Sequence, residues 1–269
     1  NKGTPGSHRS SWNAPRFLGE KGRDYSSLWK KEIKTFFRTP AQWSQLLIIG
    51  AIVVVFILNM KGIPLPHVSV KHIIAYLNLG MAAFIVAGLN SRFTFTAIPM
   101  EIPGVVHLLA SPFNSVKLFR FKFFFYVVPQ VVIGFLLFFT GDIALGLDAV
   151  ARVSGIIFLA PALPFLTVLS LYFSLKLEES VPLTPQHLVV SRSGISYMLL
   201  SLVYIAGSMI YFVRPLFLYH YNQFLKRPVP YLEISLWFAG YVVVSLVLII
   251  FFYKKSIRLW KTKEFSFSV

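Results

Sequence analysis

Long apolar runs separated by short polar segments occupy most of the sequence from residue 43 to residue 253. Six runs come close to the roughly 20 residues that an α-helix needs to cross a membrane; they are residues 43–60, 72–89, 123–140, 152–175, 197–213 and 231–253. The runs lack the alternation of barrel strands, and unpaired backbone groups are costly in lipid, so each run is expected to be a helix. The pattern predicts an all-α integral membrane protein with six transmembrane helices.

Prolines interrupt two of these runs. Pro129 lies in the third, and Pro161 and Pro164 lie in the fourth. A proline inside a helix removes one backbone donor and bends the helix axis. The bends either serve packing or form a hinge, and the sequence leaves both interpretations open.

The composition agrees with a membrane protein. Of the 269 residues, 56% are hydrophobic and only 13% are charged, and the mean hydropathy is +0.67. The chain contains no cysteine, which excludes disulfides, thiolate metal sites and cysteine nucleophiles. The net charge of +16 does not indicate nucleic-acid binding, because the basic residues lie beside apolar runs rather than on a soluble face.

The lysines and arginines predict an orientation. With the N-terminus in the cytoplasm, 20 of the 26 Lys and Arg residues fall on the cytoplasmic side of the six runs. Positive charge accumulates on that side of membrane proteins. Both termini are therefore expected in the cytoplasm, with the chain in a bacterial inner or cytoplasmic membrane.

The segments outside the runs differ in character. Residues 1–25 have the composition of a flexible basic tail or linker. Residues 26–42 alternate apolar and basic positions at helical spacing, which predicts a helix lying in the headgroup layer. Residues 254–269 form a basic cytoplasmic tail. Because the chain begins with Asn1, it is expected to be a processed chain or the later portion of a longer polypeptide.

The basic segment between the second and third runs has helical features of its own. Pro112 can begin a helix, and Val116, Phe119 and Phe123 then fall on one face. This spacing predicts a short interfacial helix that leads into the third run. An ordinary basic loop that obeys the charge rule is the alternative.

Three stretches of the sequence form a recognisable set: Trp29-Lys30-Lys31-Glu32 through Pro40-Ala41-Gln42-Trp43, Ser91-Arg92-Phe93 through Glu101 and Gly104, and Leu108-Leu109-Ala110-Ser111-Pro112 followed by Lys122. On these stretches the chain resembles the ABC-2 type exporter permeases, the transmembrane subunits of ABC transporters. One departure is the insertion of Ile102-Pro103 between Glu101 and Gly104.

The resemblance implies a connecting helix at 26–42, a transmembrane domain at 43–253 and a coupling helix seated on a nucleotide-binding subunit. The residues implied in ATPase coupling are Arg92, Glu101, Gly104, Ser111, Pro112, Lys117, Arg120 and Lys122. We expect an ion pair between Glu101 and Arg92 to fix this segment.

The resemblance also implies short helices between the fifth and sixth runs that close the outer end of a transport path. Arg214 and Pro215 are expected to end the fifth helix. The implied gate residues are Arg214, Phe217, Tyr219, His220, Tyr221 and Phe224. An interfacial belt of aromatic side chains without a gating role is the alternative.

ATP hydrolysis is expected on another chain. A P-loop ends in Gly-Lys-Ser/Thr, and no Gly-Lys pair occurs in this sequence. ATP and magnesium are therefore assigned to a partner ATPase subunit, and this chain is expected to be no enzyme and to hold no cofactor or metal. A second permease half or a second copy is the other expected partner, together with membrane lipids and no nucleic acid.

The predicted function is export of a hydrophobic or amphiphilic substrate by ATPase-coupled alternating access. Sparse polar residues within the runs are the candidates for contact with substrate or for helix packing; they are Asn78, Gln130, Ser170 and Ser208. A non-transporting membrane scaffold and, less favoured, an intramembrane enzyme are the alternatives. The acidic residues flank the runs, and the histidines are scattered, which disfavours the enzyme.

Overall fold

The computed structural model describes residues 29–30, 32–34, 47, 50–51, 53–55, 58, 68–101, 115–177 and 185–267, and the statements below concern those residues. Contacts divide the chain into two units, Asn1–Pro40 and Ala41–Val269. In the first unit, the described residues at 29–30 and 32–34 are helical. All helices named below belong to the second unit.

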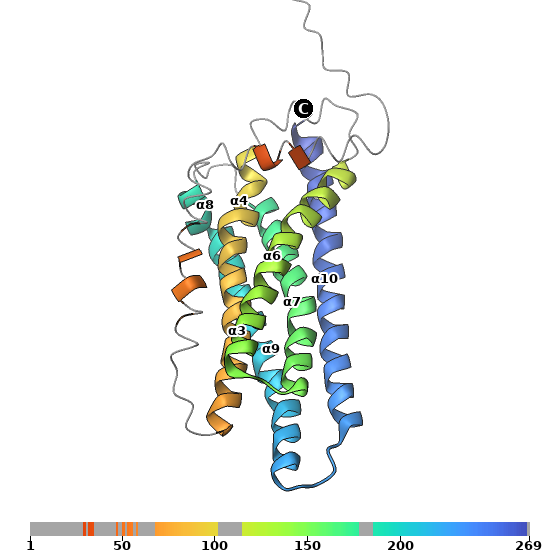
Figure 1. Cartoon of the computed structure of the whole chain (residues 1–269). Helices are drawn as coiled ribbons and strands as arrows, with labels where there is room; N and C mark the ends of the chain where they lie inside the picture. Colours follow the sequence, from red (N-terminus) through yellow and green to blue (C-terminus); the bar gives the residue numbers. More distant parts are fainter. Residues whose placement is uncertain are drawn as a thin grey trace, which may run out of the picture. The chain divides into compact units, whose positions relative to one another are not determined.

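All secondary-structure elements in the described part of the second unit are helices, and the described connections between them are short turns (Figure 1). Its long helices are α3 (Val68–Leu89), α6 (Ser115–Leu145), α7 (Ala149–Leu175), α9 (Arg192–Phe224) and α10 (Tyr231–Phe267). Four short elements accompany them: the π-helical turn η1 (Asn90–Thr94), α4 (Phe95–Ala97), the 3-10 turn η2 (Pro99–Glu101) and α8 (Pro185–Val190).

Five of the six predicted transmembrane helices are present as helices that are long and apolar enough to cross a membrane. Each extends beyond its apolar run, and α10 continues as a helix through most of the predicted basic tail. The predicted first span lies mostly outside the described residues. The described positions within it, at 47, 50–51, 53–55 and 58, are helical.

The prediction that Arg214 and Pro215 end the fifth helix is wrong. Pro215 lies inside α9, which continues to Phe224. A proline removes a single backbone donor, whereas ending the helix in apolar surroundings would leave several backbone groups without partners. The helix therefore continues, and the short helices expected after Val213 are absent from the described residues.

The expected short helix before the third span is also different. Val116 and Phe119 lie in the first turns of α6, which runs without a break from Ser115 into the span. Phe119 and Phe123 do share a face, because their ring centroids both lie 5.5 Å from that of Tyr253 on α10. Residues 102–114 lie outside the described residues, so no separate coupling helix is confirmed.

Helix α7 occupies the centre of the bundle and packs against α3, α6, α9 and α10. Within its apolar window 72% of the residues are buried, against 22% for α6 and for α10. A helix that is apolar on all sides needs such a position, whereas the other helices keep one face outward. In Figure 1, α7 lies between α6 and α10.

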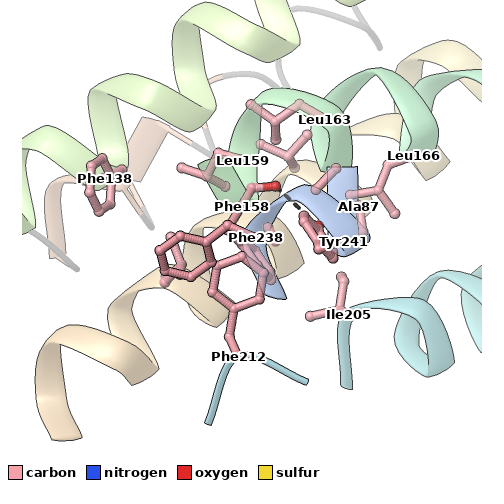
Figure 2. Close-up of a cluster of buried hydrophobic side chains, with 14 of the residues drawn as sticks. Ala87, Phe138, Phe158, Leu159, Leu163, Leu166, Ile205, Phe212, Phe238 and Tyr241 are labelled. Atoms are coloured by element: carbon pink, nitrogen blue, oxygen red, sulfur yellow. Dashed lines mark hydrogen bonds between the residues drawn. The ribbon is translucent and has the colours of Figure 1, made fainter. Parts of the chain in front are cut away.

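An aromatic cluster joins α7, α9 and α10 (Figure 2). The Phe158 ring stacks on Tyr241 with centroids 5.8 Å apart and meets Phe212 edge-on at 5.3 Å. The Tyr241 hydroxyl donates to the carbonyl of Phe158 over 3.1 Å. Aromatic pairs with this geometry contribute roughly 0.5–1.5 kcal/mol beyond the area they bury.

The outward faces of the bundle are apolar. Large hydrophobic side chains that are more than half exposed occur on each of the four outer long helices; examples are Ile73, Val132, Ile210 and Val247. Soluble proteins rarely expose apolar patches this extensive, so these faces indicate contact with lipid.

Candidate functional site

A π-helical turn at Asn90–Thr94 forms the first polar cluster inside the bundle. The backbone N–H of Phe95 donates to the Asn90 carbonyl across this widened turn. The Ser170 hydroxyl on α7 donates to the same carbonyl over 3.0 Å, and Thr94 Oγ1 donates to Asn90 Oδ1 over 2.7 Å. π-Helical turns of this kind occur frequently at functional sites.

The neighbouring turn is held from α9. The Tyr197 hydroxyl donates over 3.0 Å to the carbonyl of Ala87, three residues before Asn90. Tyr197 is fully buried, so its hydroxyl has a partner as buried tyrosines usually do. Helices α7 and α9 thus both donate to backbone carbonyls where α3 passes into η1.

A second cluster of hydroxyl groups lies between α9 and α10. The Tyr204 hydroxyl is 3.1 Å from the Tyr241 hydroxyl and 3.1 Å from Ser245 Oγ. Tyr241 continues this chain to α7 through its hydrogen bond to Phe158. Linked hydrogen bonds in an apolar interior hold three helices in one arrangement.

Asn78 is a buried polar side chain whose amide nitrogen and oxygen find no hydrogen-bond partner among the described residues. It contacts Gly141 of α6, where a Cβ atom would collide with the Asn78 amide. The other polar candidates within the runs, Gln130, Ser170 and Ser208, are buried as well. Of these, Ser170 serves the π-turn of α3, which is a packing role.

An ion pair spans the connection between α6 and α7. Arg152 Nε lies 2.6 Å from Asp142 Oδ2. The Asp142 side chain is 3% exposed and that of Arg152 is 48% exposed. Asp142 and Arg152 thus pair with each other at this connection.

A cavity of about 30 Å³ lies between α3, α6, α7 and α9. Tyr76, Ser154 and His220 provide polar groups in a lining that is otherwise apolar. The Tyr76 hydroxyl has no hydrogen-bond partner among the described residues. A polar cavity of this size has room for a water molecule but not for an organic substrate.

The two ends of the bundle differ in their described charged residues. At one end α3 and α7 finish, α6 and α9 begin, and the last turns of α10 lie; we name it the basic end (Figure 1). Among the described side chains of the second unit, no carboxylate lies at this end, and its cations are Arg92, Lys117, Arg120, Lys122, Lys176, Arg192, Lys254, Lys255, Arg258 and Lys261. The opposite end has the described acids Asp142, Asp148 and Glu233.

The residues expected to act in ATPase coupling are only partly described. Arg92, Lys117 and Arg120 are exposed at the basic end, whereas Lys122 is buried. Glu101 is in η2, but its side chain lies outside the described residues, as do Gly104, Ser111 and Pro112. The expected ion pair between Glu101 and Arg92 therefore stays a prediction.

The residues expected in an outer gate follow the last turns of α9. Arg214 lies over the Trp237 ring at 4.7 Å and 3.9 Å from Glu233. Phe217, Tyr221 and Phe224 are exposed. In contrast, Tyr219 is buried, and His220 lines the small cavity. The six residues thus lie in different surroundings, and their role in an outer gate stays a prediction.

The polar clusters are formed by residues that the sequence pattern did not single out, namely Asn90, Thr94, Tyr197, Tyr204 and Tyr241. A spacing of four residues between Asn90 and Thr94 could have indicated a local side-chain pair. Tyr204 and Tyr241 lie within apolar runs and Tyr197 begins one. A hydroxyl in such surroundings needs a partner, and that is the signal which could have singled them out.

The apolar outer faces and five long helices define a membrane protein built as a helical bundle. The chain matches, over residues 17–265, the family described as "Putative ATP-binding cassette", and it belongs to that family. The search of curated proteins and the search of solved structures found no match. Membership connects the chain with ABC transporters and their partners.

This match corrects the earlier family assignment. The matched family is an ATP-binding cassette family and not an ABC-2 permease family, so the assignment as the permease subunit of an exporter is contradicted. The scaffold and intramembrane enzyme alternatives gain no support from it either. The permease assignment was wrong because apolar helical patterns indicate a membrane protein but do not identify its family.

The same description contradicts two further predictions. An ATP-binding cassette family implies that this chain carries ATPase activity, against the expectation that it is no enzyme. It likewise implies ATP and magnesium on this chain, against the expectation that they bind only to a partner subunit.

The described helices lack the elements of a P-loop nucleotide site. A P-loop places backbone N–H groups and a lysine around phosphate between a strand and a helix. The described residues include no strand. At the π-turn the carbonyls of Ala87 and Asn90 and the side-chain oxygen of Asn90 already accept hydrogen bonds from Tyr197, Ser170 and Thr94. These helices do not fit a P-loop nucleotide, and no step of ATP chemistry is derived from them.

Proposed function

We propose that the five described helices form the membrane-embedded domain of an ATP-binding cassette transport system. One observation carries the proposal: within the matched range, helices apolar enough for lipid surround α7, and their outward faces are apolar. Exposed apolar faces are favourable in hydrocarbon and unfavourable in water. The family membership is the reason for proposing an ATP-binding cassette system.

The interior supports a fixed bundle rather than loosely associated helices. Donors on α7 and α9 reach the carbonyls of Ala87 and Asn90, where α3 passes into η1. In a membrane such polar contacts contribute to association because apolar contact with lipid is nearly as good as contact with another helix. We propose that the π-turn holds α3, α7 and α9 in one arrangement.

The charge distribution supports an orientation with the basic end in the cytoplasm. All three described carboxylates of the second unit lie at the opposite end, and two of them face Arg152 and Arg214. The basic end has ten described Lys and Arg side chains, and the opposite end has four, Arg152, Arg214, Lys226 and Arg227. Lys and Arg residues accumulate on the cytoplasmic side of membranes, and acidic residues contribute little to the orientation. The C-terminus then lies in the cytoplasm.

The basic end is also the proposed contact surface for other parts of the transport system. Arg92, Lys117 and Arg120 are exposed there. Exposed cations that lack a described acid attract acidic partner surfaces, mainly by raising the rate of association. These three side chains are the proposed coupling contacts.

Two measurements on the full chain test this proposal. Expressed in membranes, the chain should resist extraction by alkaline carbonate, as a spanning bundle does; recovery in the soluble fraction would refute membrane embedding. Photolabelling with azido-ATP, followed by mapping of labelled peptides, tests whether these helices bind ATP. Any label should map outside α3, α6, α7, α9 and α10, and label within these helices would contradict the assignment.

A further inference from the structure

Tyr172, near the C-terminal end of α7, has two lysines beside its ring. Lys176 Nζ lies 5.4 Å from the ring centroid, and Lys255 Nζ, which comes from α10, also lies 5.4 Å from it. Both lysine side chains are exposed, whereas Tyr172 is buried. Two ammonium groups from different helices therefore converge on one ring at the basic end.

Only one of these two lysines lies where the helix dipole favours a positive charge. Lys176 follows the last turn of α7, where the negative end of the helix dipole favours a positive charge. Lys255 lies within α10, well before its end, and gains nothing comparable. The ion pairs among the described residues involve neither lysine. Ring contact attracts each ammonium group singly, but the two groups repel one another.

The surface next to Lys255 has the chemistry of an acyl-chain contact. Lys255 Nζ also lies 5.4 Å from the ring centroid of Phe251, one turn earlier on α10. Phe251 is 53% exposed, and Ile250 and Val247 continue the exposed apolar face along the helix. The face leads from apolar side chains directly to a pair of ammonium groups.

We infer that Lys176, Lys255 and Tyr172 form a binding site for the headgroup of an anionic phospholipid. The phosphate accepts hydrogen bonds from the two ammonium groups, and the acyl chain lies along Val247, Ile250 and Phe251. Lysine side chains commonly extend along apolar surface to place their charge at the headgroup layer. The inference rests on the proposed membrane embedding, because the lipid must lie beside α10.

Lipid binding to the full chain, purified in a neutral detergent, tests the site. Native mass spectrometry would measure the retention of added phosphatidylglycerol and of phosphatidylcholine by the wild type and by the Lys176→Gln/Lys255→Gln variant. The wild type should prefer phosphatidylglycerol. Each lysine near a charged membrane surface changes the affinity for an anionic lipid roughly fivefold. The ratio of phosphatidylglycerol to phosphatidylcholine binding should therefore fall roughly 30-fold in the double variant.

Two further variants separate the site from general charge. Lys226→Gln/Arg227→Gln removes two exposed cations of the opposite end and should leave the preference intact. Lys176→Arg/Lys255→Arg keeps both charges and should retain most of it. Equal loss in the Lys226→Gln/Arg227→Gln variant, or a double variant within roughly twofold of the wild type, would overturn the inference.

The source of the phosphate and the folding of the variants need their own measurements. Water-soluble glycerol phosphate should not displace the lipid at equal concentration, because it lacks the acyl contact; displacement would indicate a site for free phosphate and overturn the lipid assignment. Each variant is first checked for resistance to alkaline carbonate. Extraction of the wild type would refute the membrane domain itself, whereas loss of lipid preference alone concerns only this site.

Discussion

Arg152 donates from Nε to Oδ2 of Asp142 over 2.6 Å, and this pair ties the end of α6 to the first turns of α7. The connection between them includes Gly146, which has a φ of 55°. That left-handed conformation suits glycine and allows the short reversal. A buried carboxylate beside such a turn requires a partner, and Arg152 provides it.

Replacing Arg152 by Gln should destabilise the bundle. The variant leaves Asp142 buried without its charged partner, at a cost of about 1–3 kcal/mol. Thermal unfolding in detergent should therefore show a lower midpoint. The Arg152→Gln/Asp142→Asn variant removes both charges and should recover part of the loss.

Arg227→Gln is the matched control, because Arg227 is exposed and has no described carboxylate partner. Its midpoint should equal that of the wild type. An equal midpoint for Arg152→Gln would show that the ion pair contributes nothing to stability.

Removing the Tyr197 hydroxyl should weaken the contact between α9 and α3. In Tyr197→Phe the carbonyl of Ala87 loses a buried donor, and the expected cost is about 1 kcal/mol. Ser170→Ala removes the donor to the Asn90 carbonyl and should cost a similar amount. The midpoint of thermal unfolding measures both.

Tyr221→Phe serves as the control for Tyr197→Phe, since Tyr221 is an exposed tyrosine of the same helix. The double variant Tyr197→Phe/Ser170→Ala reports whether the two donors act on one element. If they do, the combined loss should differ from the sum of the single losses. Strictly additive losses would argue against a common role of the π-turn.

The sequence predicted the helices well and the polar interior poorly. Long apolar runs require helices in lipid, so α3, α6, α7, α9 and α10 could be recognised without a structure. Their ends were less predictable, because charged turns such as those of α10 continue a helix once it is begun. Pro215 lies inside α9 because one proline removes a single backbone donor, whereas ending the helix in apolar surroundings would leave several backbone groups without partners.

Contacts between distant parts of the chain could not be predicted. Ser170 and Asn90 are eighty residues apart in the sequence, and no pattern connects a hydroxyl on one run with a carbonyl on another. Pairings of this kind depend on which faces of the helices meet. Neither could the family be inferred, because apolar periodicity is common to many membrane proteins.

Replacing Gly141 by Ala should disturb the packing of α6 on α3. The added methyl group would collide with the amide of Asn78, so the Asn78 side chain or one of the two helices must shift, and such overpacking costs about 1–3 kcal/mol. Thermal unfolding should show the loss. In Gly141→Ala/Asn78→Ala the colliding amide is removed, and the midpoint should return toward that of Asn78→Ala alone.

Gly207→Ala provides the comparison, because nothing lies within 4 Å of a Cβ atom at Gly207. Alanine is also the better helix former, so the midpoint should stay equal or rise. If Gly141→Ala behaved like Gly207→Ala, the close approach of Asn78 to α6 would be contradicted.

Reversing charge at Lys117 and Arg120 should weaken association with the other components of the transport system. The Lys117→Glu/Arg120→Glu variant turns two exposed cations of the basic end into acids and should repel an acidic partner surface. Affinity purification through a tag on this chain should show reduced recovery of partners. Nucleotide hydrolysis is then measured on the purified assembly. Lys226→Glu/Arg227→Glu should leave recovery unchanged, and equal recovery from both variants would remove the proposed contact surface.

The orientation of the bundle can be measured because the chain contains no cysteine of its own. Lys226→Cys places a thiol in the exposed α9–α10 connection, and Lys261→Cys places one on an exposed turn at the basic end. In intact cells a membrane-impermeant maleimide should label Lys226→Cys and spare Lys261→Cys. After the membrane is permeabilised, both should be labelled. Labelling of Lys261→Cys alone in intact cells would reverse the orientation and place the cation-rich end outside the cytoplasm.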